Sequence, residues 1–356
     1  MITLLSTVFV LGVLIFVHEF GHFIFAKLFK IRVERFSLGY PPRMIGKKVG
    51  DTDYCLSWVP FGGYVKISGM VDESMDEEAL KTPPKPWEFR SRPWIQRMLV
   101  VFAGPMMNIV FTFLIFWIGT LVVGQQTYDE SSRVGRVEVN MPAEAAGVLS
   151  GDRVTSVNGS PVTQWIEMTQ AIRNSGGETL ELTVLRADSS FTLILTPDVR
   201  EVDQDGQIVR VPVIGIGAVT ERHSISFGRS FIQAGTMTWD LGKLIVESVS
   251  KLIAGRESIK NLAGPVGIAQ MAGQSARAGW VSLISFMALL SLNLAILNLM
   301  PIPVLDGGHL LFLTIEGVIR REIPLKVKLI IQQVGMAVIL VFMVLVIYND
   351  VLRVFK

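Results

Sequence analysis

The sequence predicts an α-helical polytopic membrane protein of about four transmembrane helices, with an inserted extracytoplasmic α+β domain and a β-loop on the cytoplasmic side. Two observations predict this class. Half of the 356 residues are hydrophobic and only 18% are charged, whereas soluble domains carry about 25% charged residues. Four segments also approach the roughly 20 apolar residues that span a bilayer. They are Ile2 to Phe25, Leu99 to Gly124, Trp280 to Met300 and about Leu329 to Tyr348.

The remaining composition excludes several classes of protein. The formal net charge of +2 is too small to favour binding to nucleic acid, so we expect no such partner. Cys55 is the only cysteine, which excludes an internal disulfide and a thiolate metal site. The N-terminal apolar run lacks a basic region before it and contains a polar motif of its own. We therefore expect it to be retained as a span rather than removed as a signal peptide.

Basic residues near the ends of the spans predict which side each loop faces. They follow the first span, precede the second and separate the third from the fourth: Lys27, Lys30, Arg32, Arg35, Arg90, Arg92, Arg97, Arg320, Arg321, Lys326 and Lys328. With four spans all these loops lie on one side, which is then cytoplasmic. The N-terminus, the stretch from Gln125 to about Gly279 and the C-terminus face outward. Arg353 and Lys356 weakly oppose this orientation.

We divide the chain into seven parts. They are a first transmembrane helix (1–26), a cytoplasmic-side β-loop and linker (27–96), a second transmembrane helix (97–124), an α+β domain (125–222), an amphipathic membrane-surface region (223–279), a third transmembrane helix (280–318), and a fourth with the tail (319–356).

Two of these parts need comment. Ile31 to Met70 alternates β-type residues with glycines and predicts short strands, whereas Val71 to Lys85 is acidic and then proline-rich and predicts an exposed loop. In the region 223–279, aromatic residues such as Trp239 stand among basic and polar ones. This pattern suits helices on a membrane surface and, equally, helices packed on the inserted domain.

The inserted domain alternates short strands with two short helices. Asn158-Gly159 between two β-type runs predicts a hairpin turn, and Trp165 to Arg173 can form an amphipathic helix. The stretch GVLSGDRVTSVNGSPV (Gly147 to Val162) resembles a bacterial, circularly permuted PDZ domain. In PDZ domains a loop of backbone N–H groups holds a peptide C-terminus. The matching place here is RVGRV, which is Arg133, Val134, Gly135, Arg136 and Val137.

Three ionisable side chains interrupt the first span. His18 and His22 are four residues apart, so on a helix their imidazoles face the same way, with Glu19 turned by about 100°. This is the HExxH pattern, in which two histidines bind Zn²⁺ and the glutamate acts as general base on water. Placing these groups in hydrocarbon only to bond other helices is costly.

A catalytic zinc ion needs a third protein ligand, and two candidates lie at the end of the third span. Asp306 and His309 approach the cytoplasmic face, as does His18 on the first span. Both side chains are of types that bind zinc. Their chemistry alone leaves the choice open.

Four features together resemble the site-2 protease family of intramembrane zinc metalloproteases. They are HEFGH in a first span, AGPMMN (Ala103 to Asn108) in a second, a PDZ-like domain, and then NLMPIPVLDGG (Asn298 to Gly308). The resemblance covers essentially the whole chain. It implies one catalytic Zn²⁺ held by His18, His22 and Asp306, with Glu19 as the catalytic base. His309 is then a supporting or packing residue.

The resemblance also suggests how substrate is bound. Asn298, the asparagine of the NxxPxPxxDG motif, would hydrogen-bond the substrate backbone, and Asn293, earlier on the same helix, would do likewise. For both residues the alternative is interhelical hydrogen bonding, which is common in membranes.

A helical substrate must unwind before its amide can react, which leaves unpaired backbone groups. The segment FGGYVKI can pair with them by strand addition. Gly62 and Gly63 would allow close approach, and Tyr64 and Val65 follow them. A similar β-loop beside the active site is expected from the family, and an ordinary hairpin turn is the alternative.

We expect AGPMMN to be structural first and to shape the helix contact around the metal. Gly104 permits close approach, and Asn108 can satisfy a backbone group that Pro105 frees.

The family resemblance implies the following function. The chain would cut a previously trimmed single-span membrane protein in the bacterial inner membrane, with the PDZ domain outside and the active site towards the cytoplasm. The implied partners are the lipid bilayer, an anti-sigma factor of a stress response and remnant signal peptides. A catalytically silent PDZ scaffold and a metal transporter are the alternatives. The best-known bacterial members carry two tandem PDZ domains, whereas only one is legible here.

Overall fold

The computed structural model describes residues 1–70, 83–204, 207–257 and 263–354. The chain forms two compact units, one made of residues 1–119 and 228–356 and the other of residues 120–227. Most of the exposed loop predicted from Val71 to Lys85 lies outside the described residues.

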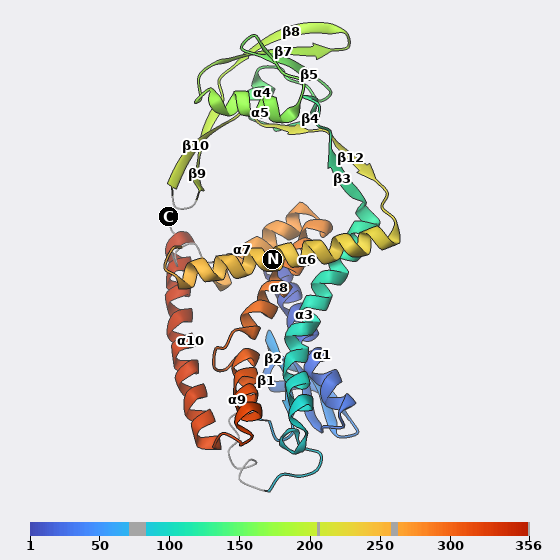
Figure 1. The fold of residues 1–356 in the computed structure, drawn as a ribbon, viewed down its shortest axis with the longest axis vertical. Coiled ribbons are helices and arrows are strands. Elements are labelled where there is room, and N and C mark those ends of the chain that lie inside the picture. The colour runs from blue at the N-terminus through green and yellow to red at the C-terminus, as the bar shows by residue number, and fades with distance from the viewer. Residues whose placement is uncertain (71–82, 205–206, 258–262, 355–356) are drawn as a thin grey trace. The chain divides into compact units, whose positions relative to one another are not determined.

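Four helices of the first unit are long and apolar enough to cross a membrane. They are α1 (Ile2–Leu28), α3 (Trp94–Val123), α8 (Trp280–Leu299) and α10 (Leu325–Val354). Figure 1 shows that they run in roughly the same direction, with α6 (Phe227–Ile253) and α7 (Pro265–Ala278) crossing them at one end. These four candidate spans of the described residues coincide with the four segments that the hydrophobic pattern indicates.

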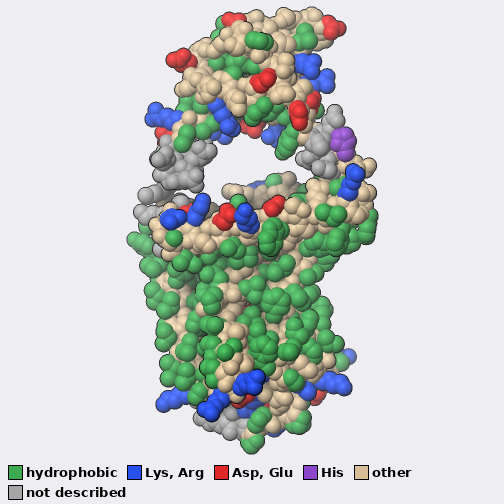
Figure 2. Space-filling view, viewed as in Figure 1, with side chains coloured by type: hydrophobic (Ala, Val, Ile, Leu, Met, Phe, Trp, Pro, Cys, Tyr) green, Lys and Arg blue, Asp and Glu red, His purple; other side chains and the backbone are tan. Residues whose placement is uncertain are grey.

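The surface of this helical unit is unusually apolar. Figure 2 shows a broad band of hydrophobic side chains over it, with Lys and Arg at both ends of the band. On α10 the exposed residues include Val338, Leu340, Val341 and Phe342. A soluble monomer rarely exposes so large a continuous apolar surface, whereas a lipid-facing helix requires one.

The loop between α1 and α3 folds as a long antiparallel hairpin. Its strands are β1 (Val33–Val49) and β2 (Thr52–Ile67), and a 3₁₀ turn, η1 (Phe89–Ser91), precedes α3. The register shifts along the hairpin, so that Leu38 of β1 has both Gly63 and Leu56 of β2 as partners. The end of β2 therefore lies along one edge of a small, irregular sheet.

The second unit is the inserted α+β domain. Its elements are β3 (Gln125–Tyr128), β4 (Val134–Val137), α4 (Pro142–Ala145), β5 (Arg153–Val157), β6 (Ser160–Pro161), α5 (Trp165–Asn174), β7 (Leu180–Arg186), β8 (Ser189–Leu195), β9 (Asp198–Gln204), β10 (Gln207–Val213), β11 (Ile216–Ala218) and β12 (Thr220–His223).

A four-stranded antiparallel sheet in the order β6-β5-β7-β8 forms the centre of this unit. Met168 of α5 packs with Val154, Leu182 and Val184 of the sheet in one apolar core. Asn158 and Gly159 both have positive φ angles, of 50° and 75°, as the predicted hairpin turn requires. The arrangement is PDZ-like, and the described residues contain one such domain.

The remaining helices pack within the first unit. The aromatic ring of Phe231 on α6 lies against Phe113 and Trp117 of α3, while Ile232 and Trp239 of α6 stay exposed. Helix α9 (Asp306–Ile319) follows α8 after the linker 300–305, whose last residue, Leu305, is the N-cap of α9. A place for α6 on the membrane surface remains a prediction.

Candidate metal centre

Three side chains from two distant parts of the chain converge beside α1. His18 Nε2 lies 3.0 Å from Asp306 Oδ2, and His22 Nε2 lies 3.4 Å from Asp306 Oδ1. The two imidazole Nε2 atoms are 3.3 Å apart. Each residue therefore offers one ligand atom, and these atoms lie within 4.8 Å of one another, as a metal site requires. Both histidines are buried.

Local sequence explains why Asp306 reaches this position. Met300 caps the end of α8 just before Pro301, and a loop leads to Asp306, the first residue of α9. A Cβ atom at Gly307 would overlap the carbonyl of Met300, and one at Gly308 would approach the carbonyl of Ile302. The two glycines thus let the first turn of α9 fold tightly back on the loop, which directs Asp306 towards α1.

Two more glycines let α3 approach α1 closely. A Cβ atom at Gly104 would overlap the imidazole of His22 and meet that of His18, and one at Gly21 would overlap the carbonyl of Ala103. The expectation that Gly104 permits close approach at this helix contact agrees with this geometry.

The outer ring nitrogens of both histidines contact α3. The backbone carbonyl of Val100 lies 2.8 Å from His22 Nδ1, and the side-chain amide of Asn108 lies 3.3 Å from His18 Nδ1. Sequence reasoning assigned Asn108 to a backbone group freed by Pro105. Instead its side chain contacts an imidazole, because the close approach at Gly104 brings α3 against α1. In the sequence, the feature that could have indicated this contact is a polar asparagine within an otherwise apolar span.

A cavity of about 580 Å³ adjoins the three side chains. Glu19 and Asn298 both line it, and Asn298 Nδ2 lies 3.5 Å from His18 Nε2. The end of β2 forms another wall, through Gly62, Gly63, Tyr64, Val65, Lys66 and Ile67. The hairpin predicted from FGGYVKI is thus next to the site. Asn293 is not among the residues that line this cavity.

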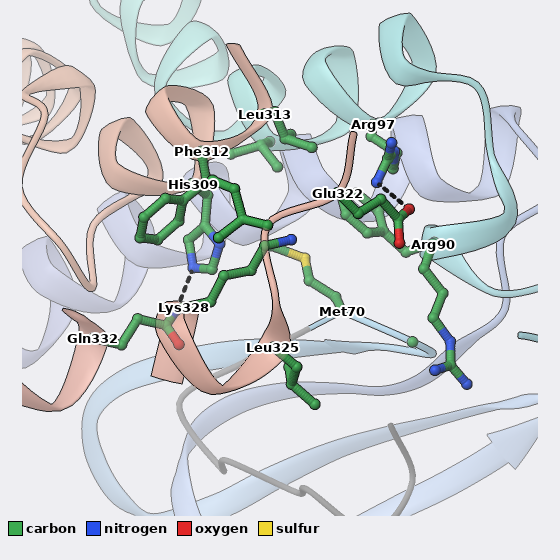
Figure 3. A pocket seen from close by; sticks show the side chains of 14 residues that line it. Met70, Arg90, Arg97, His309, Phe312, Leu313, Glu322, Leu325, Lys328 and Gln332 are labelled. Carbon is green, nitrogen blue, oxygen red and sulfur yellow. Dashed lines mark hydrogen bonds and ion pairs between the residues drawn. The ribbon is translucent and has the colours of Figure 1, made fainter. Parts of the chain in front are cut away.

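His309 also lines this cavity but is not one of the three converging ligands, and it contacts α10. Its Nε2 accepts a hydrogen bond from Gln332 Nε2 at 3.2 Å. Figure 3 shows this pair in a second cavity of about 210 Å³, where Arg97 lies beside Glu322. The cations of that cavity are all paired with carboxylates, so it offers no free charge to hold an anion.

In the PDZ-like unit, a cavity of about 300 Å³ lies between α5 and the segment 211–216. Trp165, Thr169 and Ile172 of α5 line it on one side. The predicted ligand loop, Arg133 to Val137, does not line it, because β4 pairs there with β11. Its role as a ligand loop stays a prediction.

The cluster fits a zinc ion chemically. Two imidazole nitrogens and a carboxylate oxygen are ligand types that catalytic zinc sites use. Both oxygens of the Asp306 carboxylate face imidazole nitrogens, Oδ2 towards His18 and Oδ1 towards His22. A buried carboxylate beside two imidazoles whose ligand atoms converge on one point is a donor set that suits a divalent cation.

The sequence matches the model of peptidase family M50 over residues 6–342. A Brucella suis protein provisionally named a zinc metalloprotease is 34% identical over 98% of this chain and 94% of its own. A Campylobacter jejuni protein of similar name is 30% identical over 99% and 94%. The Salmonella typhimurium regulator of sigma-E protease, RseP, is 30% identical over 96% and 97%; its alignment of 443 positions is longer than this chain of 356 residues.

Among solved structures, the PDZ domain of an SdrC-like protein from Listeria monocytogenes is 22% identical, covers 26% of this chain and 92% of that one, and has a TM-score of 0.21. The family match spans nearly the whole sequence, and full-length relatives agree with it. The chain belongs to peptidase family M50, the site-2 proteases, and is a zinc metalloprotease.

Proposed function

We propose that this protein cuts a peptide bond within or beside the transmembrane segment of a single-span membrane protein whose outer domain has already been removed. The observation that supports this most is the convergence of His18, His22 and Asp306 beside a cavity that also holds Glu19. Because His18, Glu19 and His22 belong to a helix apolar enough to span a membrane, the bond to be cut must itself reach membrane depth.

His18, His22 and Asp306 are the residues that would hold the zinc ion. When bound, zinc acts as a Lewis acid and lowers the pKa of water towards about 7. Glu19 faces the same cavity and would take the proton of the attacking water, then return it to the leaving amine. Asn298, which lines the same cavity, would donate a hydrogen bond to the substrate backbone. Asn293 is a weaker candidate, since it does not reach the cavity.

The end of β2 would hold the unwound substrate. Residues 63–67 pair with β1 along one edge, and no further strand covers their other edge in the described residues. That edge borders the cavity. An extended substrate segment could add there as a strand, with its backbone groups paired in place of the lost helical bonds. A Cβ atom at Gly63 would crowd the carbonyl of Ser37 and lie 3.8 Å from Glu19 Cγ, so the absence of a side chain there would allow close approach.

We place the protein in the bacterial inner membrane, with the metal centre towards the cytoplasm and the PDZ-like unit outside. The excess of Lys and Arg in the loops after α1, before α3 and before α10 supports this orientation. In view of the similarity to RseP, we propose an anti-sigma factor of a stress response as substrate, and remnant signal peptides as a further class. The PDZ-like unit would admit only substrates that have lost their outer domain.

Cleavage of a fluorescent single-span substrate by the full chain in detergent tests this proposal. Glu19→Gln should lower the cleavage rate by about 10²- to 10⁴-fold while bound zinc is retained, whereas His18→Ala should lose the zinc. Ser285→Ala, an exposed change on α8, is the control. Full activity of Glu19→Gln would disprove the assigned base. If the wild-type chain cleaves neither trimmed nor intact substrates, the silent-scaffold alternative is favoured.

A further inference from the structure

Asn108 is the one polar side chain of the described residues that contacts the outer nitrogen of His18. It is fully buried on α3, with its amide 3.3 Å from His18 Nδ1. Its side-chain Oδ1 has no hydrogen-bond partner among the described residues. A buried amide with one atom on an imidazole and the other unsatisfied needs a physical explanation.

The ring chemistry of histidine supplies that explanation. His18 Nε2 faces Asp306 and His22, so Nε2 is the nitrogen that must keep its lone pair for a metal ion. A neutral imidazole that binds metal through Nε2 carries its proton on Nδ1, and this N–H requires an acceptor. For His22 the acceptor is the carbonyl of Val100. For His18, the described residues place the amide of Asn108 in that position.

The amide can meet this requirement without any other movement. Rotation by 180° about the last side-chain bond exchanges the oxygen and nitrogen of an asparagine, which have nearly the same shape. Oδ1, the atom without a partner, then faces His18 Nδ1. An ordinary packing role does not account for this contact, because the helix contacts of Asn108 use its backbone carbonyl, which accepts hydrogen bonds from Thr112 and Ser291.

We propose that Asn108 is a positioning residue whose side-chain oxygen accepts the Nδ1–H of His18, and thereby fixes the imidazole tautomer and ring angle that direct Nε2 to the metal. This rests on the proposed function, in that His18 must be a zinc ligand. Asn108 itself touches neither metal nor substrate. Val100 and Asn108, eight residues apart on α3, would then orient the two histidines of α1 from the same helix.

Zinc affinity of the full chain, measured by competition with a chromophoric chelator, tests the proposal separately from activity. Asn108→Leu keeps the size of the side chain but removes the acceptor, and should weaken zinc binding by about 10- to 100-fold. Asn108→Asp supplies only acceptor atoms and should stay within about threefold of wild type. Ser291→Ala removes a hydrogen bond to the Asn108 backbone and is the matched control, with unchanged affinity.

The outcomes separate the two levels of inference. Wild-type affinity in Asn108→Leu, or an equal loss in Asn108→Asp, overturns the acceptor role of Asn108. If His18→Ala keeps its zinc, the proposed metal site itself is wrong. Cobalt substitution gives a second readout that does not depend on folding yield. The visible Co²⁺ spectrum should shift in Asn108→Leu and match wild type in Asn108→Asp, and an unshifted Leu spectrum contradicts the proposal.

Discussion

At the scale of single residues, the metal centre depends on side chains that are missing as much as on those that are present. Gly104 lies where any Cβ atom would overlap the imidazole of His22. Gly307 and Gly308 likewise lie where a Cβ atom would overlap the backbone of the loop that leads to Asp306. Close backbone approach between membrane helices is the usual reason for small residues there, and here it sets the position of all three candidate ligands.

Gly104→Ala should therefore abolish zinc binding while the chain still folds. The added methyl group must displace His22 or push α3 away from α1, and zinc sites tolerate ligand shifts of only about 0.2 Å. Zinc content of the purified variant measures this. Gly119→Ala on the same helix is the control, since a Cβ atom there meets nothing within 4 Å. Normal zinc content in Gly104→Ala would contradict the packing argument.

Asp152 in the PDZ-like unit is buried and forms an ion pair with the partly exposed Arg186. Burial alone would raise the pKa of its carboxyl, but hydrogen bonds from Arg186 and the N–H of Leu149 outweigh burial and lower that pKa. A carboxyl with a lowered folded-state pKa stabilises the fold above its ordinary pKa of about 3.9, and this stabilisation is lost as the pH falls through the folded-state value.

Asp152→Asn should thus lower the free energy of unfolding of this unit by about 1 to 3 kcal/mol at neutral pH, because the buried Asp152 carboxylate loses its charge-assisted hydrogen bonds. The variant should also lose less stability than wild type when the pH falls below about 4, because it lacks the carboxyl whose protonation destabilises the fold. Hydrogen exchange of peptides from residues 150–186 measures both effects. Asp188→Asn, at an exposed turn, serves as control. A variant as stable and as acid-sensitive as wild type would refute the pairing.

At the scale of secondary-structure elements, the apolar pattern predicts the helices well. α1, α3, α8 and α10 agree with four hydrophobic segments because a spanning helix must satisfy its own backbone and show lipid an apolar surface, both of which are local properties. The β1–β2 hairpin was predicted only as short strands. Its shifted register pairs Leu38 with both Leu56 and Gly63, and pairing between residues this far apart is not recorded in any local pattern.

Proline substitutions in β2 test the open edge of the hairpin. Neighbouring residues of a strand direct their N–H groups to opposite edges. Of the two single variants Tyr64→Pro and Val65→Pro, one therefore loses an N–H that faces β1 and the other loses an N–H on the open edge. We expect the variant that loses the outer N–H to cleave a transmembrane substrate at least about tenfold more slowly, with zinc binding unchanged. Equal, wild-type rates in both variants would exclude strand addition.

At the scale of the whole molecule, orientation follows from charge. The loop containing the exposed Lys47 should lie in the cytoplasm, and Ser189, at an exposed turn of the PDZ-like unit, should lie outside. In spheroplasts, a membrane-impermeant maleimide should label Ser189→Cys at once and Lys47→Cys only after lysis. Labelling of Lys47→Cys before lysis would reverse the orientation, and Cys55→Ser provides the unlabelled background.

The sequence by itself determined the four spans, the single PDZ-like domain and the family, because hydrophobic length, turn residues and paired motifs are local features of the chain. It also placed the HExxH residues on one helix face, since a helix has a fixed period. The family resemblance also implied Asp306 as the third ligand, and the structure agrees by bringing Asp306 to both histidines. Only the tertiary structure showed that Asn108 contacts His18 and that Asn298, but not Asn293, lines the cavity beside the cluster. These contacts join helices that are far apart in the sequence. They depend on how closely the helices pack at glycine residues, and a local sequence pattern does not reveal that distance.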